Sequence, residues 1–432
     1  MRLLHTSDWH LGQNFMGKSR QAEHQQLIDW LMVQVDAHAV DAVLIAGDIF
    51  DTGTPPSYAR ELYSQLVVRL HAAGVALLLL GGNHDSVATL RESSALLEQL
   101  SASVVPAADA PANQVRVLPQ RGGGGAGATP GCVVCAVPFI RARDVTQSEY
   151  GQSAEQKQQS LQLAIQAYYQ AVHAQAQSTR KLLSAQLGRH VPLIATGHLT
   201  TVGASASESV REIYVGALDA FPTSAFPDVD YLALGHIHRP QKVGGLAHIR
   251  YSGSPIALSF DEAAQQKEVL LVDLGETGLE AVTPLPVPVF QPLVALRGNL
   301  KSLPGAFAQV AQVAQVAQVA QVAQVAQAAC DASPERPVWL EVTVAEDDYL
   351  ADLPARIQAM AEGLPLEVLR IRRERGNAVA QWSGSAGVTL DELDPLDVFA
   401  QRLAHETLED DIRAALTERY KSVLVATVEG EA

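Results

Sequence analysis

Strand-like and helix-like patterns alternate along the first 100 residues. Short apolar runs predict strands at Arg2–Thr6, Ala42–Ala46 and Val75–Leu80. Between them, hydrophobic residues recur at helical spacing over Ser19–His38 and Ser57–Ala73. Nearly continuous apolar strands separated by helices are typical of a sheet that is covered on both faces. The pattern therefore predicts an α/β fold with α+β layers.

The next segment adds a predicted β-hairpin. Gln114–Leu118 and Cys132–Ile140 flank a glycine-rich stretch at 121–127. A glycine run can bind phosphate, but no helix beginning with Lys-Ser or Lys-Thr follows this one, which favours a flexible turn. Cys132 and Cys135 are three residues apart, so on a strand they face opposite sides of the sheet. We expect buried core thiols there.

A long Gln/Ala-rich stretch over 155–187 predicts a helix, and strands that end in glycine resume at Pro192–Thr196 and Asp230–Leu234. Four prolines between residues 284 and 292 then indicate a linker. We therefore expect a first domain at 1–285.

A smaller α/β module is predicted for 286–380. It contains six consecutive Ala-Gln-Val units at 308–325. Valines three residues apart drift around a helix and leave no fixed apolar face. The tract is either a partner-binding arm or, as we favour, a low-complexity expansion tolerated at the surface. Strand, helix and strand patterns follow at Val338–Val344, Tyr349–Ala361 and Glu367–Arg373.

The C-terminal segment 385–432 carries two amphipathic patterns, which predict two helices. Their apolar positions are Leu396, Phe399 and Leu403, followed by Ile412, Leu416, Tyr420 and Val423. Such helices either bind a partner or pack onto the chain's own second module.

The composition describes an acidic chain that is able to form cores. Hydrophobic residues make up 47% of it and the net charge is −16 at pH 7. This excludes extensive disorder and a uniformly basic nucleic-acid coat, although a small basic groove remains compatible with it. Three cysteines are too few for a disulfide framework. We expect a reducing, cytoplasmic location, with neither a signal peptide nor a membrane span.

Five short polar motifs follow predicted strands. Because the ends of adjacent strands in one sheet meet at a common edge, we expect these motifs to lie together. A lone Gly-Asp turn or buried histidine is usually structural, but five in series indicate a metal site. The motifs are Asp8-Trp9-His10, Gly47-Asp48-Ile49-Phe50-Asp51, Gly82-Asn83-His84-Asp85, Gly197-His198 and Gly235-His236-Ile237-His238.

The residue types favour a particular class of metal. Carboxylates, an amide and imidazoles without thiolate suit Mn, Fe or Zn rather than calcium or a structural zinc. One carboxylate can bridge two cations about 3.5–4 Å apart, and such a pair can stabilise both the attacking and the leaving group of a phosphoryl displacement.

In this order, the motifs resemble the calcineurin-like metallophosphoesterases, whose pattern is D-x-H, G-D-x-x-D, G-N-H-[DE], H and G-H-x-H. The flanking residues at 5–12, 195–203 and 234–239 are more narrowly similar to the nuclease subunits of bacterial SbcCD complexes. The resemblance runs from residue 1 to about 300 and continues more loosely to the end. The Ala-Gln-Val tract departs from it.

The resemblance implies a β-sandwich flanked by helices, with a capping domain and C-terminal helices. It also implies two divalent metal ions, with Mn²⁺ as the expected identity. One metal would be held by Asp8, His10, Asp48 and His238, and the other by Asp48, Asn83, His198 and His236. Of the catalytic residues, His84 would face the scissile phosphate and Asp51 would orient it. The alternative for Asp51 is an acid that stabilises its turn.

The same resemblance implies partners and a substrate. These are double-stranded DNA ends and hairpins, an SbcC-like ATPase of the SMC family, and a homodimer within a heterotetramer. The sequence lacks the G-x-x-x-x-G-K-[ST] motif, so ATP hydrolysis by that route falls to the partner. Arginines at 20, 60, 91 and 239 and a cluster at 370–375 either contact DNA or serve ordinary surface roles. The alternatives are a phosphodiesterase acting on nucleotides or small phosphoesters, and a non-enzymatic scaffold.

Overall fold

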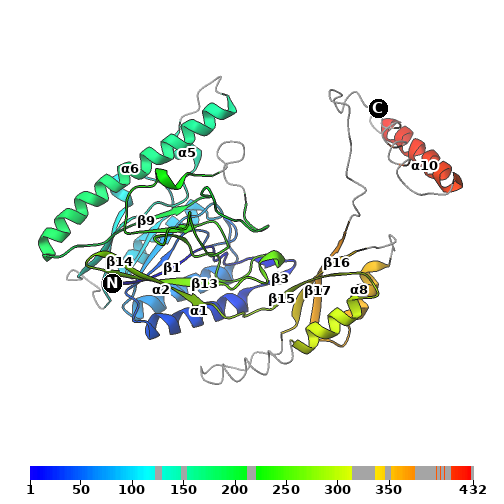
Figure 1. Cartoon of the computed structure of the whole chain (residues 1–432), viewed down its shortest axis with the longest axis horizontal. Coiled ribbons are helices and arrows are strands. Elements are labelled where there is room, and N and C mark those ends of the chain that lie inside the picture. Colours follow the sequence, from blue (N-terminus) through cyan, green and yellow to red (C-terminus); the bar gives the residue numbers. More distant parts are fainter. Residues whose placement is uncertain are drawn as a thin grey trace.

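The larger part of the chain is a sandwich of two six-stranded sheets with helices outside both (Figure 1). This computed structural model describes residues 1–121, 129–146, 153–211, 220–313, 336–345, 352–374, 396, 399, 403 and 410–429. The predicted layered α/β fold is confirmed. Among the described residues, no helix is both long enough and apolar enough to cross a bilayer.

The first sheet has a parallel centre and an antiparallel hairpin at one edge. The four strands nearest the N-terminus are parallel to one another, and two later strands pair antiparallel beside the first of them. The carboxyl ends of the parallel strands therefore share one edge. In order across the sheet, the strands are β14 (Gly278–Pro286), β13 (Glu268–Gly275), β1 (Arg2–Thr6), β4 (Ala42–Ile45), β5 (Ala76–Leu80) and β6 (Ala102–Val105).

The second sheet repeats this plan. Its four central strands are parallel, and each outer strand pairs antiparallel with its neighbour. The strands at Val115–Pro119 and Pro130–Cys135 pair antiparallel, which confirms the predicted hairpin around the glycine-rich turn. In order across the sheet, they are β11 (Gln241–Lys242), β12 (Ile249–Tyr251), β10 (Tyr231–Gly235), β9 (Leu193–His198), β8 (Pro130–Cys135) and β7 (Val115–Pro119).

Three apolar cores join the layers. One fills the space between the sheets, and the others lie between each sheet and its helices. The longest helix begins at a capping box, in which Ser153 and Gln156 each accept the other's backbone N–H, and it ends at Gly188 with a left-handed φ of 65°. The helices of the sandwich are α1 (Gln21–Ala37), α2 (Ser57–Ala72), α3 (Val87–Arg91), α4 (Ser94–Gln99), α5 (Ala142–Val145) and α6 (Ala154–Leu187), with 3₁₀ turns η1 (Pro111–Gln114), η2 (Thr223–Ala225) and η3 (Phe260–Glu262).

The two cysteines of β8 occupy different cores. Cys132 packs between the sheets, whereas Cys135 packs beneath α6. Both thiols are free and buried, and burial raises the pKa of each to about 12. This confirms the prediction of core thiols, since a protonated, buried thiol is neither a nucleophile nor a metal ligand.

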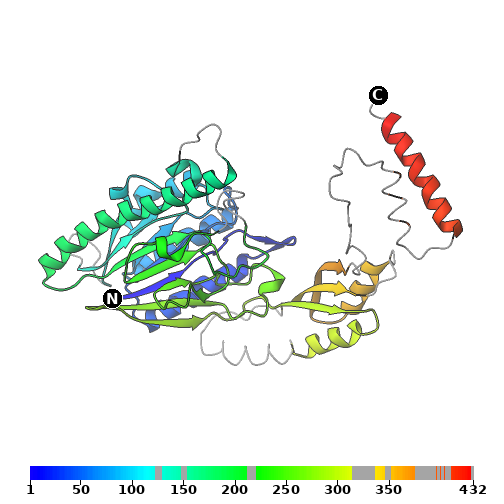
Figure 2. The ribbon, with the colours of Figure 1, turned by 45° about the horizontal axis from the view of Figure 1, so that its top comes forward.

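A smaller module lies to one side of the sandwich (Figure 2). It consists of three parallel strands, the helix α8 (Leu353–Ala361) and a helical stretch at 303–313, which share one core. The strands are β15 (Leu293–Gly298), β16 (Val338–Val344) and β17 (Leu366–Arg373).

A short hairpin joins this module to the sandwich. It is formed by β2 (Asn14–Phe15) and β3 (Lys18–Ser19). The Phe15 ring stacks on Trp339 with centroids 5.7 Å apart, and Lys18 forms an ion pair with Glu367. The hairpin follows directly on the loop after β1, so the module is fixed close to the first of the polar motifs.

Several expectations fall outside the described residues. These are the conformation of the glycine-rich turn at 122–128, the Ala-Gln-Val tract beyond residue 313, and most of the first C-terminal helix. The second C-terminal pattern is present as α10 (Asp410–Glu429). Division of the chain at 285 and 380 remains a prediction.

Candidate metal centre

The five polar motifs come together at one edge of the sandwich. Every predicted ligand follows or ends a parallel strand of one of the two sheets, which is why distant sequence segments meet here. The ligand side chains are Asp8 and His10 after β1, Asp48 after β4, Asn83 after β5, His198 at the end of β9, and His236 and His238 after β10.

Four of these residues have a backbone conformation that non-glycine residues rarely adopt. The φ angles are 53° at Asp8, 47° at His10, 49° at Asp48 and 90° at His236. Backbone hydrogen bonds between the loops hold them in this conformation, such as the one that His10 N donates to Asp48 O at 3.0 Å. Left-handed conformations at several non-glycine residues cluster at functional sites, because the surrounding structure must impose them.

A glycine beside the ligands allows the strand ends to approach closely. A Cβ at Gly47 would lie 2.1 Å from His198 Nδ1. No side chain fits within that distance, so any other residue at this position would displace a ligand. This explains the glycine that precedes Asp48.

Among the residues that the structure describes, three groups of possible ligand atoms lie at this edge, and two of them contain only predicted ligands. Asp8, His10 and His238 offer atoms that lie within 4.8 Å of one another, and Asp48, His198 and His236 do the same. Each of these two groups holds three residues of one ligand set expected from the sequence, and the third group joins His84 to His10 and Asp48. The assignment of the ligands stays a prediction.

Asp48 lies between the two groups. Its Oδ2 is 3.2 Å from His198 Nε2 and 3.7 Å from His10 Nε2. Asn83 completes the second group, because its Oδ1 is 2.9 Å from His198 Nε2 and 3.1 Å from His236 Nδ1. One carboxylate thus faces ligands of both groups, as a bridging ligand must.

Unpartnered nitrogens show that the site fits metal ions. Within the described part of the chain, His10 Nε2 and His236 Nε2 are buried and have no hydrogen-bond partner. Leaving a buried polar atom unsatisfied costs about 1–3 kcal/mol, so such atoms point to a missing ligand. The ring of His198 is also fixed: its Nδ1 lies 2.9 Å from the carbonyl oxygen of Ala46, which leaves Nε2 directed into the site. These residues fit a pair of divalent cations.

The charges in the site are strongly coupled. Burial raises the pKa of Asp48, but the imidazoles of His198 and His10 outweigh it and hold that pKa well below its usual range. Burial lowers the pKa of His198, yet the Asp48 carboxylate beside it raises that pKa to about 9. Without a metal ion, a protonated imidazole therefore offsets the Asp48 charge.

Metal binding is expected to release a proton from His198 at pH 8. With its pKa at about 9, this imidazole is mostly protonated at pH 8 when no metal is bound, and a metal ligand must be neutral. Affinity should rise with pH up to about 9 and level off above it. Calorimetric titration with Mn²⁺ in two buffers of different ionisation enthalpy measures the release. Equal heats in both buffers would contradict this prediction.

His84 lies beside both ligand groups. Its Nδ1 is 2.8 Å from the backbone oxygen of Asp51, to which it donates, and its ring meets that of His10 edge-on at 4.6 Å. Burial lowers the pKa of His84 despite the nearby Asp48 carboxylate. The ring is only partly buried, in contrast to the ligand histidines. It is therefore placed to meet a substrate at the mouth of the site.

The structure changes the role expected for Asp51. Its carboxylate does not hold His84; Asp51 Oδ1 lies 3.1 Å from His10 Nδ1 instead. Only the main-chain oxygen of Asp51 orients His84. The Asp51 side chain therefore orients a predicted metal ligand, His10. The turn after Asp48 directs the carbonyl and the carboxylate of Asp51 to different histidines.

The sequence interpretation gave no role to Asp85, which ties the loops together. Its carboxylate accepts hydrogen bonds from the backbone N–H groups of Ile49, Phe50 and Gly82 at 2.9–3.1 Å. Burial raises the pKa of Asp85 to about 6. The signal was present, since Asp85 ends the Gly-Asn-His-Asp motif. Glu262, Lys267 and Ser209, which contact His238, lie in no such motif.

Some arginines proposed to contact DNA have other partners. Arg20 is only 1% exposed and pairs with Glu23 at 2.6 Å, so it cannot reach a phosphate. Arg370 pairs with Glu341, and Arg372 lies 3.7 Å from Glu208. These contacts correct the prediction for Arg20 and neutralise part of the 370–375 cluster. The arginines at 60, 91 and 239 are exposed, and their DNA contacts remain predictions.

Comparison with known proteins gives matches along the whole chain. The profile of the calcineurin-like phosphoesterases matches residues 1–240, and that of the type 5 capsule protein repressor C-terminal domain matches 289–407. The SbcD chain of the SbcCD nuclease from Escherichia coli K12 is 47% identical over 431 residues, covering 100% of this chain and 99% of the relative.

More distant relatives bear the same name. The SbcD chain of Rhodobacter capsulatus is 32% identical, covering 83% of this chain and 87% of that protein. The Bacillus subtilis protein is 30% identical, covering 65% and 68%. With its strand-end ligand groups and these matches, the chain belongs to the SbcD nuclease family of calcineurin-like phosphoesterases.

Proposed function

We propose that this chain is the nuclease component of an SbcCD-type complex and hydrolyses DNA phosphodiester bonds at a centre for two Mn²⁺ ions. In the complex it acts as an ATP-dependent 3′ to 5′ double-strand exonuclease and as an endonuclease that opens hairpins, in DNA repair, recombination and replication. The observation that carries the proposal is the position of Asp48 between two ligand groups, in a chain 47% identical to a named nuclease over its full length.

The site residues divide the work of such a reaction. When bound, two divalent cations supply Lewis-acid activation of water and of the phosphoryl oxygens. Asp48, between the groups, fixes the spacing of the ligands. His84, whose Nδ1 donates to the Asp51 carbonyl, presents its Nε2 to the phosphate. When Nε2 also carries a proton, the ring can stabilise negative charge or protonate the leaving oxygen.

An ATPase partner of the SMC family completes the proposal. The sequence has no P-loop motif, so the ATP dependence must come from another chain. Helix α10 offers a docking element, because Leu416, one of the apolar residues at helical spacing, is 40% exposed and available to a partner. An amphipathic helix of this kind fits the base of a coiled coil. We propose a homodimer of this chain within a heterotetramer that holds two ATPases.

Cleavage by the purified chain tests the function. With Mn²⁺, the ATPase partner and ATP, we expect hairpin opening and shortening of a duplex from its 3′ ends, both lost on chelation. A small phosphodiester substrate is the parallel assay. If the small phosphodiester is hydrolysed but neither DNA is cleaved, with the partner present, the nuclease proposal is wrong and the chain is a small-molecule phosphodiesterase. If no substrate is cleaved, the enzyme assignment fails.

A further inference from the structure

The ring nitrogen of His238 that faces away from the metal group has two partners. His238 Nδ1 lies 2.6 Å from Ser209 Oγ and 3.2 Å from Glu262 Oε1. The serine hydroxyl itself donates to the same Glu262 oxygen. An imidazole N–H thus donates into a serine and carboxylate pair. Of the ligand histidines, His10 has a partly exposed carboxylate partner in Asp51, and His198 has a carbonyl.

Glu262 is a fully buried carboxylate with an unusually complete set of donors. Its Oε2 accepts from Lys267 Nζ at 2.7 Å and from Leu258 N at 2.9 Å, and its Oε1 accepts from Ser207 Oγ at 2.6 Å. The Lys267 ammonium pairs with this carboxylate, and the other contacts are donors as well, which is the environment of an ionised carboxylate. A buried charge is retained only where its partners compensate for lost hydration.

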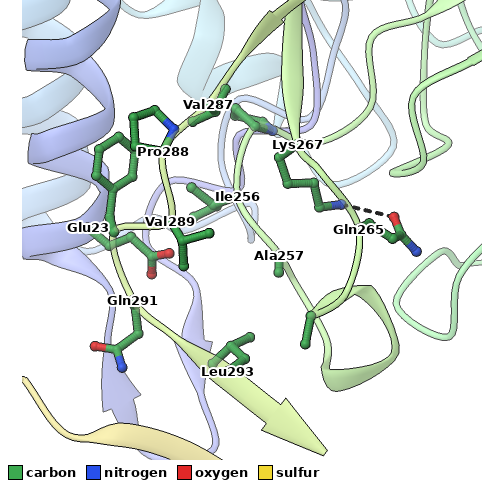
Figure 3. A pocket seen from close by; sticks show the side chains of 13 residues that line it. Glu23, Ile256, Ala257, Gln265, Lys267, Val287, Pro288, Val289, Gln291 and Leu293 are labelled. Atoms are coloured by element: carbon green, nitrogen blue, oxygen red, sulfur yellow. Dashed lines mark hydrogen bonds between the residues drawn. The ribbon is translucent and has the colours of Figure 1, made fainter. Parts of the chain in front are cut away.

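Lys267 holds the same histidine from its backbone side. The ammonium donates to the His238 carbonyl at 2.9 Å as well as to Glu262. Lys267 also lies where the linker to the smaller module leaves the sandwich: Val287 N donates to Lys267 O at 2.8 Å. In Figure 3, Lys267 and Gln265 lie near a cavity of about 30 Å³ lined by Val287 and Pro288.

We propose that Glu262 and Ser209 are positioning residues that fix the His238 ring, with the proton on Nδ1, so that Nε2 is held toward the Asp8 and His10 group. This proposal rests on the metal centre inferred above. A metal-bound histidine commonly donates its second N–H to a carboxylate, which sets the tautomer and raises ligand basicity. Here Ser209 relays that contact, and Lys267 keeps the carboxylate anchored.

The segment that carries Ser209 is itself fixed. Glu208 N donates to Asp261 Oδ2 at 3.0 Å, next to Glu262 in η3. The Glu208 side chain faces Arg370 and Arg372 of β17, at 4.0 and 3.7 Å. The segment that carries Ser209 therefore contacts both η3 and the smaller module.

Mn²⁺ binding to the full chain tests the proposal. We expect Glu262→Gln to weaken one of the two Mn²⁺ sites by roughly 10- to 100-fold and to leave the other unchanged. Calorimetry gives both affinities, and the electron paramagnetic resonance signal of a coupled Mn²⁺ pair should be lost at Mn²⁺ levels that saturate the wild type. Ser209→Ala should weaken the same site less, because Nδ1 can still reach Glu262, and Ser209→Thr should restore it.

Two further variants separate positioning from folding. Glu262→Gln leaves the Lys267 ammonium without its anion, so Glu262→Gln/Lys267→Met removes that charge and should show the same selective loss with an intact thermal transition. Glu268→Gln is the matched control, because Glu268 directly follows Lys267 as the first residue of β13. This variant should bind two ions normally. Two unaltered sites in either folded Glu262 variant would overturn the proposal. Failure of the wild type to bind two ions would instead refute the metal centre.

Discussion

Replacing Asp48 by asparagine is expected to abolish nuclease activity and to impair both metal sites together. Asp48 is the only predicted ligand assigned to both groups, and its carboxylate lies 3.2 Å from His198 Nε2 and 3.7 Å from His10 Nε2. Asparagine has the same shape but no charge. The bound cations contribute several kcal/mol of transition-state stabilisation. Because each 1.36 kcal/mol of activation free energy changes the rate tenfold, kcat should fall by about 10³-fold or more.

Two measurements check this expectation, namely the rate of duplex cleavage and the stoichiometry of Mn²⁺ binding. The matched control is Asp41→Asn, because Asp41 directly precedes β4, at the end of the strand away from Asp48, and accepts hydrogen bonds from Arg2 N and Arg121 N. The control should cleave DNA at nearly the wild-type rate. Two tightly bound ions in Asp48→Asn would show that this carboxylate does not bridge the groups.

Replacing His84 by alanine is expected to lower kcat by about 10²- to 10⁴-fold, the usual contribution of a general acid or base. The affinities for Mn²⁺ and for DNA should change little. The reason is geometric: His84 Nδ1 is engaged by the Asp51 carbonyl, and the ring is partly exposed at the mouth of the site while the ligand rings are buried. Single-turnover cleavage and Mn²⁺ calorimetry on the same sample separate the two effects.

The outcome also decides between two roles for this histidine. His84 offers a nitrogen that could join His10 and Asp48 in a third ligand group. A large loss of Mn²⁺ affinity in His84→Ala would make it a ligand and would refute the role proposed here. His71→Ala, at a histidine on the surface of α2, provides the control and should leave both quantities unchanged.

Much of the fold could be predicted because its signals are local. The predicted strand at Arg2–Thr6 matches β1, and the predicted helix at 155–187 differs from α6 by one residue at its start. The metal loops were predictable for the same reason, since polar ligands stand at or directly after the end of each apolar strand, in four of the five motifs behind a glycine. Hydrophobic runs locate the strands, and strand ends locate the site.

The parts that could not be predicted depend on contacts between distant segments. Glu262 reaches His238 across 24 residues and Ser209 across 53, and no motif surrounds Glu262 or Ser209. Arg20 was expected near DNA because it is charged, but tertiary packing buries it against Glu23. Likewise, the Asp51 carboxylate turns to His10, and no spacing in the sequence distinguishes that from an approach to His84.

The left-handed backbone at Asp8, His10, Asp48 and His236 has a consequence for how the chain can evolve. At such positions glycine is the conformationally easiest residue, while asparagine and aspartate are tolerated better than other side chains. Substitutions that destroy the metal centre can therefore relieve local strain, and inactive descendants of this chain should be able to persist as well-folded proteins. The four side chains at these positions therefore serve the metal chemistry and not the backbone conformation.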